Sequence, residues 1–168
     1  MIFFSFFSTA LSVTQISSKS FTLFEHVIIK LPCGHRKSRL LISIYILLYV
    51  PVTVFHDEFS ELLKMYTVLN YDFIIAGNIN IHVETDEVQS MRFHEIINMF
   101  DLKQHVTGPT HIKGHTIDVI ITRNDKSAIS NVDITKYNLS HYFLIDFVYN
   151  AEMVEATTKT ITYRNVKK

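Results

Sequence analysis

The 168-residue sequence has little cysteine and no net charge. Cys33 is its only cysteine, so no disulfide can form within the chain. The Cys33-Gly34-His35 stretch has too few further ligands nearby for a zinc site. The 16 Lys and Arg side chains balance the 16 Asp and Glu side chains. The chain therefore lacks the overall basic field that attracts nucleic acid, and a local basic patch is the arrangement that this balance still allows.

Two stretches lack charged side chains altogether. Residues 1–18 are rich in Phe, but they have neither the positive segment nor the small-residue cleavage site of a signal peptide. Residues 40–55 are shorter than the roughly 20 residues of a membrane-spanning helix, and their β-branched content favours a buried strand. We therefore expect no membrane span and a nuclear or cytoplasmic location. A membrane-anchored or secreted protein is the alternative that these stretches leave open.

The remaining composition fits a single folded domain. Hydrophobic residues make up 48% of the chain and aromatic residues 12%, which allows a sizeable core. Residues 1–20 show no clear period and are left as an unassigned apolar N-terminal segment. Organised structure is expected over residues 21–150. The polar residues 151–168 are interpreted as a linker or tail.

Hydrophobic periodicity predicts strands that alternate with two helices. The apolar side chains of residues 55–66 fall on one face of a helix, and residues 88–100 show a similar pattern. Apolar runs bounded by turn residues predict strands at 24–31, 40–49, 71–76, 104–106, 116–122, 130–135 and 142–149. Residues 32–39 are expected to form an exposed hairpin or loop. The alternation indicates an α/β or α+β fold with a mixed sheet.

Polar side chains gather where several of these strands end. Asn78 and Asn80 follow a buried strand, and their two-residue spacing would point both amides to one side. Tyr49 closes the preceding strand. Asp118 lies early in an apolar strand, where an unpaired charge would be unfavourable, and His141 precedes the last strand.

These residue types suit the hydrolysis of a phosphodiester. A divalent ion prefers carboxylate oxygens, and a histidine oriented by a carboxylate can hold a phosphate oxygen or activate water. Amides and a tyrosine hydroxyl can position the phosphate. Simpler interpretations exist for each residue. Gly77-Asn78 is a common turn pair, Asp118 can be a structural partner, and an isolated His141 is usually a surface or core residue.

A polar loop at residues 107–115 carries further candidate contacts. It contains His111, Lys113 and His115 and follows Lys103 closely in the sequence. Such a loop is either simply exposed to solvent or a set of contacts to phosphate groups.

Four motifs carry a specific resemblance. Residues 75–82 read Ile-Ala-Gly-Asn-Ile-Asn-Ile-His, residues 104–118 join Gln-His-Val-Thr-Gly-Pro-Thr-His to Gly-His-Thr-Ile-Asp, and residues 139–142 read Leu-Ser-His-Tyr. The fourth is Tyr49-Val50-Pro51. In the same order, they resemble four motifs of the endonuclease/exonuclease/phosphatase family. These motifs are Gly-Asp-Phe-Asn, Gln-His-Val-x-x-Pro-Thr-His with Gly-x-x-Leu-Asp, Ser-Asp-His and Tyr-x-Pro. The similarity is greatest to the apurinic-type endonuclease domain of LINE-like, non-LTR retrotransposons.

This resemblance implies a four-layer α/β sandwich, with two mixed β-sheets face to face and helices outside. Residues 21–150 would be the C-terminal part of that domain. The implied activity is Mg²⁺-dependent nicking of DNA, with a reverse transcriptase domain as partner in the parent element. Tyr49 would contact the scissile phosphate, and Asn80 would orient the nucleophile or the phosphate. Asp118 would orient His141, which would contact the phosphate or act as acid and base.

The sequence also departs from the family pattern. Asn78 stands where the family has an Asp, and an amide cannot take a proton there. The Asp between Ser140 and His141 is missing, which shifts His141 in register. The N-terminal half of the family domain, with its metal-binding Glu, has no counterpart, so an apolar face is expected to be open. We expect an endonuclease-like domain with impaired catalysis. The alternative within this class is a non-catalytic nucleic-acid-binding remnant.

Overall fold

The computed structural model describes residues 14–16, 19–33, 37–47, 51–69, 71–124, 129–136 and 141–149. In chain order these form β1 (Thr14–Ile16), β2 (Phe24–Cys33), β3 (Lys37–Ile46), α1 (Val52–Thr67), β4 (Asp72–Asn78), α2 (Val88–Met99), β5 (Leu102–Gln104), β6 (Asp118–Arg123), β7 (Ile129–Thr135) and β8 (Leu144–Tyr149). Six strands form one sheet in the order β1-β2-β3-β4-β6-β5. Strands β7 and β8 form a second sheet.

The larger sheet is mixed, as the sequence predicted. Strands β3 and β4 are parallel, and helix α1 provides the crossover that a parallel pair requires. The other neighbours in this sheet are antiparallel. Strand β4 is buried from Phe73 to Asn78, because it lies between two other strands and both of its faces are covered.

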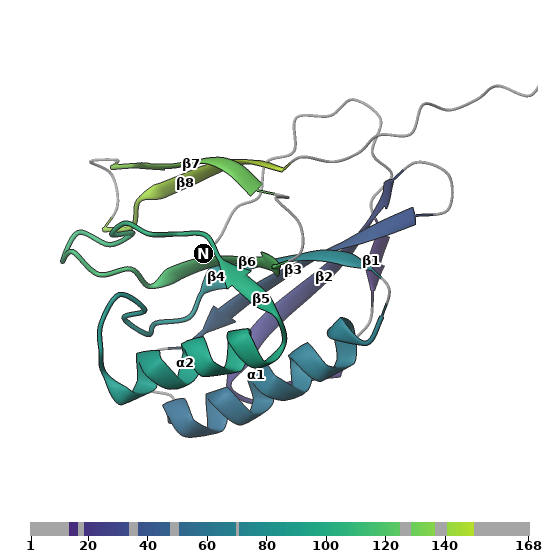
Figure 1. Ribbon diagram of the computed structural model, residues 1–168, viewed down its shortest axis with the longest axis horizontal. Helices are drawn as coiled ribbons and strands as arrows, with labels where there is room; N and C mark the ends of the chain where they lie inside the picture. The colour runs from purple at the N-terminus through teal and green to yellow at the C-terminus, as the bar shows by residue number, and fades with distance from the viewer. Residues whose placement is uncertain are drawn as a thin grey trace, which may run out of the picture.

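Both helices pack on one face of the larger sheet (Figure 1). Helix α1 begins directly after Pro51, whose carbonyl accepts hydrogen bonds from the amides of Val54 and Phe55. Pro51 thus stands at the start of the helix, where its fixed φ and its missing N–H are tolerated. The inward face of α1 carries the apolar side chains that the helical spacing predicted: Phe55, Phe59, Leu62, Leu63 and Tyr66.

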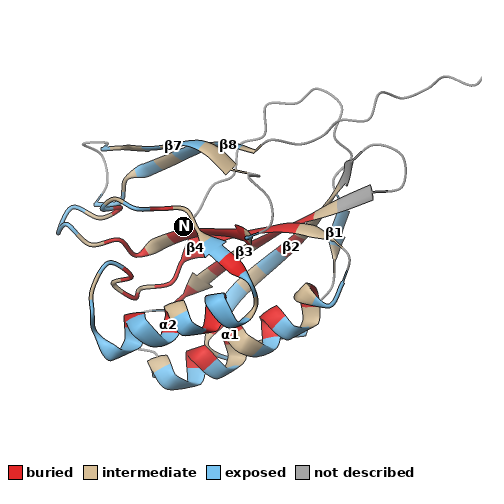
Figure 2. Cartoon of the chain, viewed as in Figure 1, coloured by how far each residue is buried: buried red, intermediate tan, exposed pale blue. Residues whose placement is uncertain are grey.

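The second sheet covers part of the opposite face (Figure 1). The apolar side chains of Ile134, Ile145 and Phe147 pack against a smaller core on the larger sheet. Burial is concentrated in the larger sheet and the helix faces turned toward it, whereas β7 and β8 are intermediate or exposed (Figure 2). The predicted α/β fold with two sheets is confirmed. Among the described residues, helices cover only the face of the larger sheet that is turned away from β7 and β8.

Several boundaries differ from those that the sequence predicted. Strand β1 lies within residues 1–20 and pairs with β2, so the organised part begins earlier than residue 21. The hairpin expected at residues 32–39 is formed by β2 and β3, which are longer than expected and pair as far as Cys33 and Lys37. The short strand expected at 104–106 is β5, at Leu102–Gln104. The extended backbone of β2 and β3 continues beyond the apolar pattern because pairing satisfies its hydrogen bonds.

The uncharged stretches do not form a spanning helix in the described part of the chain. Residues 40–46 belong to strand β3 in the sheet, and residues 52–55 begin helix α1.

Candidate functional site

Asn78 and Asp118 form the centre of the site. Asn78 ends β4 and Asp118 begins β6, and the antiparallel register places the two residues directly opposite each other. The Asn78 Nδ2 atom donates a hydrogen bond of 3.0 Å to Asp118 Oδ1. Asn78 is only 3% exposed. The amide and the carboxylate are therefore paired inside the protein, at the end of the sheet where the sequence predicted a site.

The outer oxygens of this pair lack partners in the described structure. Asn78 Oδ1 and Asp118 Oδ2 are both buried, and neither accepts a hydrogen bond from a described residue. Burial raises the pKa of the Asp118 carboxyl and outweighs the neighbouring Thr110 hydroxyl and Asn78 amide, which act in the opposite direction. The carboxylate is thus held in an environment that disfavours its charge.

Thr110 fixes the polar loop against Asp118. Its hydroxyl oxygen accepts hydrogen bonds from the backbone amides of Ile117 and Asp118, at 3.1 and 3.2 Å. Thr110 is fully buried. The next residue, His111, therefore lies beside the start of β6. A protonated His111 ring would favour the charged form of the Asp118 carboxyl. It would thus offset part of the rise in the Asp118 pKa that burial causes.

Asn80 has a different role from Asn78. Strand β4 ends at Asn78, and Asn80 adopts a left-handed backbone conformation with φ of 50°. Its Nδ2 donates a hydrogen bond of 2.7 Å to the carbonyl of Ile46, the last residue of β3. The two amides were expected to face one spot, but the two-residue period stops with the strand and each amide has its own partner.

The histidine and tyrosine candidates are placed as follows. His141 is exposed, and no hydrogen bond joins it to Asp118. The Oδ1 atom of Asp118 accepts the bond from Asn78, and its Oδ2 atom has no partner in the described structure. Tyr49 and Ser140 lie outside the described residues. The tyrosine that the register places beside Asn78 is Tyr45 of β3.

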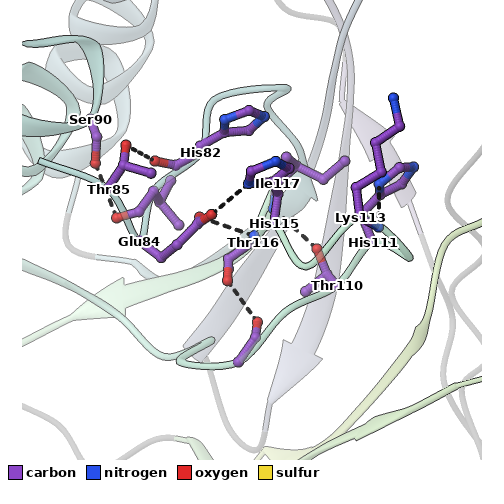
Figure 3. Close-up of polar contacts among 12 residues, drawn as sticks. His82, Glu84, Thr85, Ser90, Thr110, His111, Lys113, His115, Thr116 and Ile117 are labelled. Carbon is purple, nitrogen blue, oxygen red and sulfur yellow. Dashed lines mark hydrogen bonds and ion pairs between the residues drawn. The ribbon is translucent and has the colours of Figure 1, made fainter. Parts of the chain in front are cut away.

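Two loops meet through the side chains of Glu84 and His115 (Figure 3). His115 Nδ1 lies 2.9 Å from Glu84 Oε1, and the Thr116 amide donates to Glu84 Oε2 at 3.0 Å. The His115 ring stacks on the His82 ring, with centroids 3.7 Å apart and 2° between the planes. Burial alone would raise the pKa of Glu84, but the bonds from His115 and Thr116 lower it below its ordinary value. Glu84 therefore anchors the loop 107–115 through a charge-assisted contact.

A second pair of histidines continues this surface. The centroids of the His111 and His141 rings are 6.3 Å apart, and the His111 ring makes an edge contact with Tyr142 at 5.4 Å. The Ile112 amide donates to the carbonyl of His141 at 2.9 Å, which holds the two segments together. Partial burial and the nearby charges of Lys113 and His141 lower the pKa of His111.

Lys103 does not join the other predicted contacts. It lies on β5 opposite Thr122, which is four residues along β6 from Asp118. At about 3.3 Å per residue this separation is roughly 13 Å along the strand. Of the predicted basic contacts, the structure brings His111, Lys113 and His115 to the site and leaves Lys103 toward the other end of the sheet.

The described side chains do not supply the ligand set of the Mg²⁺ ion that the resemblance implies. A hard divalent ion needs several oxygen ligands. Asp118 is the only carboxylate of the central pair, and Glu84 is engaged by His115 and Thr116. No group of three His, Cys, Asp or Glu side chains within the described ranges is arranged to hold an ion. We therefore assign no step to a metal.

Sequence reasoning gave no role to His82, Glu84 and Thr110. All three contribute to the loop contacts, His82 and Glu84 through partners distant in the sequence and Thr110 through the amides of Ile117 and Asp118. His82 and Thr110 belong to the motifs that carry the family resemblance, and membership in a motif could have marked them as site residues. Glu84 carried none, because its partner His115 lies 31 residues away along the chain.

Comparison with solved structures identifies the architecture. The endonuclease domain of TRAS1, a telomere-specific non-LTR retrotransposon, superposes with a TM-score of 0.69 and 16% identity, over 87% of this chain and 72% of that one. The human nocturnin catalytic domain superposes with a TM-score of 0.53 and 15% identity, over 82% of this chain and 60% of that one. The chain has the endonuclease/exonuclease/phosphatase fold.

This fold agrees with the resemblance drawn from the motifs. The sequence itself matches no protein-family model and no curated protein. The chain spans less of the nocturnin domain than of the TRAS1 domain, and in both cases part of the solved structure has no counterpart here. Within the endonuclease/exonuclease/phosphatase fold of this chain, the Asn78–Asp118 pair lies at the end of β4, where the motif Gly-Asn-Ile-Asn lies.

Proposed function

We propose that the chain is a retroelement-derived endonuclease-like domain that contacts DNA phosphates but cleaves DNA poorly or not at all. Its partners would be DNA and the reverse transcriptase domain of a parent element, in the nucleus or the cytoplasm. The observation that carries the proposal is the Asn78–Asp118 pair. An amide occupies the position where the family motif has an Asp, and it donates a hydrogen bond to the Asp118 carboxylate.

Two features of this pair argue against efficient hydrolysis. The Asn78 amide cannot accept a proton from water, so it cannot serve as a general base. Asp118 hydrogen-bonds Asn78 and has no bond to His141, so it does not orient that imidazole. Loss of a positioned proton acceptor commonly costs about two to four orders of magnitude in rate.

A plasmid-nicking assay tests the catalytic part of this proposal. Purified protein is incubated with supercoiled plasmid and Mg²⁺, and relaxed product is quantified for the unchanged chain and for His141→Ala. We expect no nicking above a no-protein control in either case. Clear nicking by the unchanged chain that disappears in His141→Ala would overturn the proposal, because it would show an active site that uses His141.

A restoration experiment provides the converse test. Asn78→Asp combined with an Asp inserted before His141 returns two motif residues to the chain. We expect no nicking from this variant either, because the metal-binding Glu of the family's N-terminal half has no counterpart. Nicking by the restored variant would mean that these two positions alone account for the loss.

The DNA-binding part is tested separately by fluorescence anisotropy with a labelled duplex. The loop residues His111, Lys113 and His115 would contact phosphates, and such contacts weaken steeply as salt is raised. We expect binding that falls with salt concentration and weakens in Lys113→Gln. The exposed Lys64 on helix α1, away from the loop, provides the matched control Lys64→Gln. Equal effects of the two substitutions would contradict a contact at the loop.

A further inference from the structure

Four histidines form one continuous surface beside the Asn78–Asp118 pair. We call His82, His111, His115 and His141 the histidine rim. His82 stacks on His115, and the amide of His111 donates to the carbonyl of His115 at 3.1 Å. His111 in turn lies 6.3 Å from His141, ring to ring. The segments of His82 and of His111 and His115 lie side by side (Figure 3), and the ring contact and the Ile112–His141 backbone bond add a third segment.

Three charged side chains lie among these rings. Glu84 is bound to His115, and Asp118 acts on His111 from the start of β6. Lys113 lies in the same loop as His111, and its amide donates to His111 Nδ1 at 3.3 Å. The ring of Tyr142 also makes an edge contact with the His111 ring. With neutral imidazoles, the rim therefore has no excess of positive charge for a polyanion.

Protonation changes this balance. Histidine is the side chain whose ordinary pKa, about 6.5, makes it gain charge just below neutral pH. His141 is exposed and the other three rings are partly accessible, so a bound anion could reach them. Each protonated imidazole adds a positive charge to a loop that Glu84 and Thr110 hold in place.

Mutual repulsion within the rim links protonation to anion binding. The positive charges of Lys113 and His141 act against protonation of His111, which is also partly buried. A phosphate placed between these groups would screen that repulsion and favour the charged imidazole. By linkage, a ligand that favours protonation binds more tightly as the pH falls.

We propose that the histidine rim is a contact surface for the phosphate backbone of DNA, and that it binds DNA with uptake of protons. This inference rests on the proposed function and specifies how binding at that site is regulated. The unprotonated rim would bind weakly, and binding would strengthen as the pH falls through the range in which the histidines gain charge.

The first experiment measures anisotropy of a labelled DNA duplex at pH 7.5, 6.5 and 5.8. Uptake of one proton per complex gives about a tenfold rise in affinity for each unit by which the pH falls, in the range above the pKa of the free imidazole and below that of the DNA-bound one. We expect a rise of at least about threefold between pH 7.5 and 6.5, and a larger rise at pH 5.8. The salt dependence should also steepen, by about 0.9 in log–log slope for each additional phosphate that is neutralised. Circular dichroism at each pH verifies that the chain stays folded.

Calorimetry gives a second measurement, made at a single pH, so it does not require a comparison between pH values. The binding enthalpy at pH 6.5 is measured in two buffers of different protonation enthalpy, and the difference yields the number of protons taken up. We expect a positive number for the unchanged chain and a smaller number for the double variant His82→Gln, His115→Gln. The matched control is His26→Gln, which removes a half-buried imidazole on β2, outside the rim.

The outcomes separate the two proposals. Absence of DNA binding at every pH would overturn the proposed DNA contact itself. Binding without a pH dependence, or with the same proton uptake in the rim variant, would overturn the inference about the rim and leave the proposed contact standing. Inorganic phosphate serves as a competitor in a final arm. Displacement of DNA by millimolar phosphate alone would show a site for free phosphate and would also overturn the inference.

Discussion

Gly77 of β4 lies so close to Ile44 of β3 that a Cβ atom on Gly77 would be 1.9 Å from the Ile44 carbonyl oxygen. The two residues are partners in the parallel register, directly before Asn78. The obstacle is backbone and not a flexible side chain, so it cannot move without separating the strands. Gly77 thus allows the close strand approach from which the Asn78–Asp118 pair projects.

We predict that Gly77→Ala lowers the free energy of unfolding by at least about 3 kcal/mol, beyond ordinary overpacking in a core. Urea denaturation followed by circular dichroism measures the change. Gly108→Ala is the matched control, because a Cβ there would meet only the terminal Ile134 Cδ1 atom, at 3.0 Å. We expect a change below about 1 kcal/mol for that control. Equal losses in the two variants would contradict the proposed backbone clash.

The fold could be predicted from the sequence to the extent that local patterns determine it. Phe55, Phe59 and Leu62 repeat at helical spacing, and all are buried against the sheet. The helix begins directly after Pro51, three residues before the apolar helical pattern. Such features depend on neighbours within a few residues, and the printed order of side chains reveals them.

The geometry of the site could be predicted only in part. Asn78 and Asp118 were both candidates, but their pairing depends on the register of strands 40 residues apart. The left-handed backbone of Asn80 directs its side-chain amide to the carbonyl of Ile46, and the periodicity of the sequence does not predict this hydrogen bond. The contact between Glu84 and His115 likewise arises from two loops that only the folded sheet brings together.

Arg123 connects the end of α1 to the start of β4. Its guanidinium donates hydrogen bonds to the carbonyls of Thr67, Leu69 and Tyr71, at 2.9, 2.9 and 3.3 Å. We predict that Arg123→Ala lowers the free energy of unfolding by about 1–3 kcal/mol, because several carbonyls lose a charged donor at once. Arg123→Lys should recover only part of the loss, since an ammonium group cannot reproduce the planar fork. Thermal and urea denaturation measure both variants.

Arg92 supplies the comparison for this prediction. It forms a 3.1 Å ion pair with Glu95 on the exposed side of α2. Such a pair contributes about 0.3–0.5 kcal/mol, so Arg92→Ala should be nearly neutral. A loss at Arg92 as large as that at Arg123 would contradict a specific role for the carbonyl contacts.

His56 makes stability depend on pH. It is 5% exposed in α1, and its Nε2 has no hydrogen-bond partner among the described residues. Burial, with a smaller contribution from the charge of Arg92, lowers the pKa of His56 below 6.5. The unfolded chain therefore takes up this proton at a higher pH than the folded chain does. The stability contributed by neutral His56 is complete above pH 6.5 and is lost as the pH falls from 6.5 through the lowered pKa.

We predict that the free energy of unfolding decreases between pH 7.5 and 5.5 and that His56→Leu flattens this profile. Urea denaturation at several pH values measures both proteins. His26 and His105 also have pKa values lowered by burial, so some pH dependence should remain in the variant. An unchanged pH profile after His56→Leu would mean that the pKa of His56 does not differ between the folded and unfolded chain, and would contradict the prediction.

Asp118 has the opposite linkage. Burial raises its pKa above 3.8, so the charged carboxylate is unfavourable in the folded chain, and this penalty disappears as the pH falls through the raised pKa. We predict that Asp118→Asn raises the free energy of unfolding at pH 7.5 by about 0.5–2 kcal/mol, since an amide keeps the shape without the charge. The gain should shrink toward pH 4. Asp86→Asn, on an exposed loop, is the control and should change stability by less than about 0.5 kcal/mol. A loss of stability in Asp118→Asn at pH 7.5 would show that the charge itself strengthens the bond from Asn78.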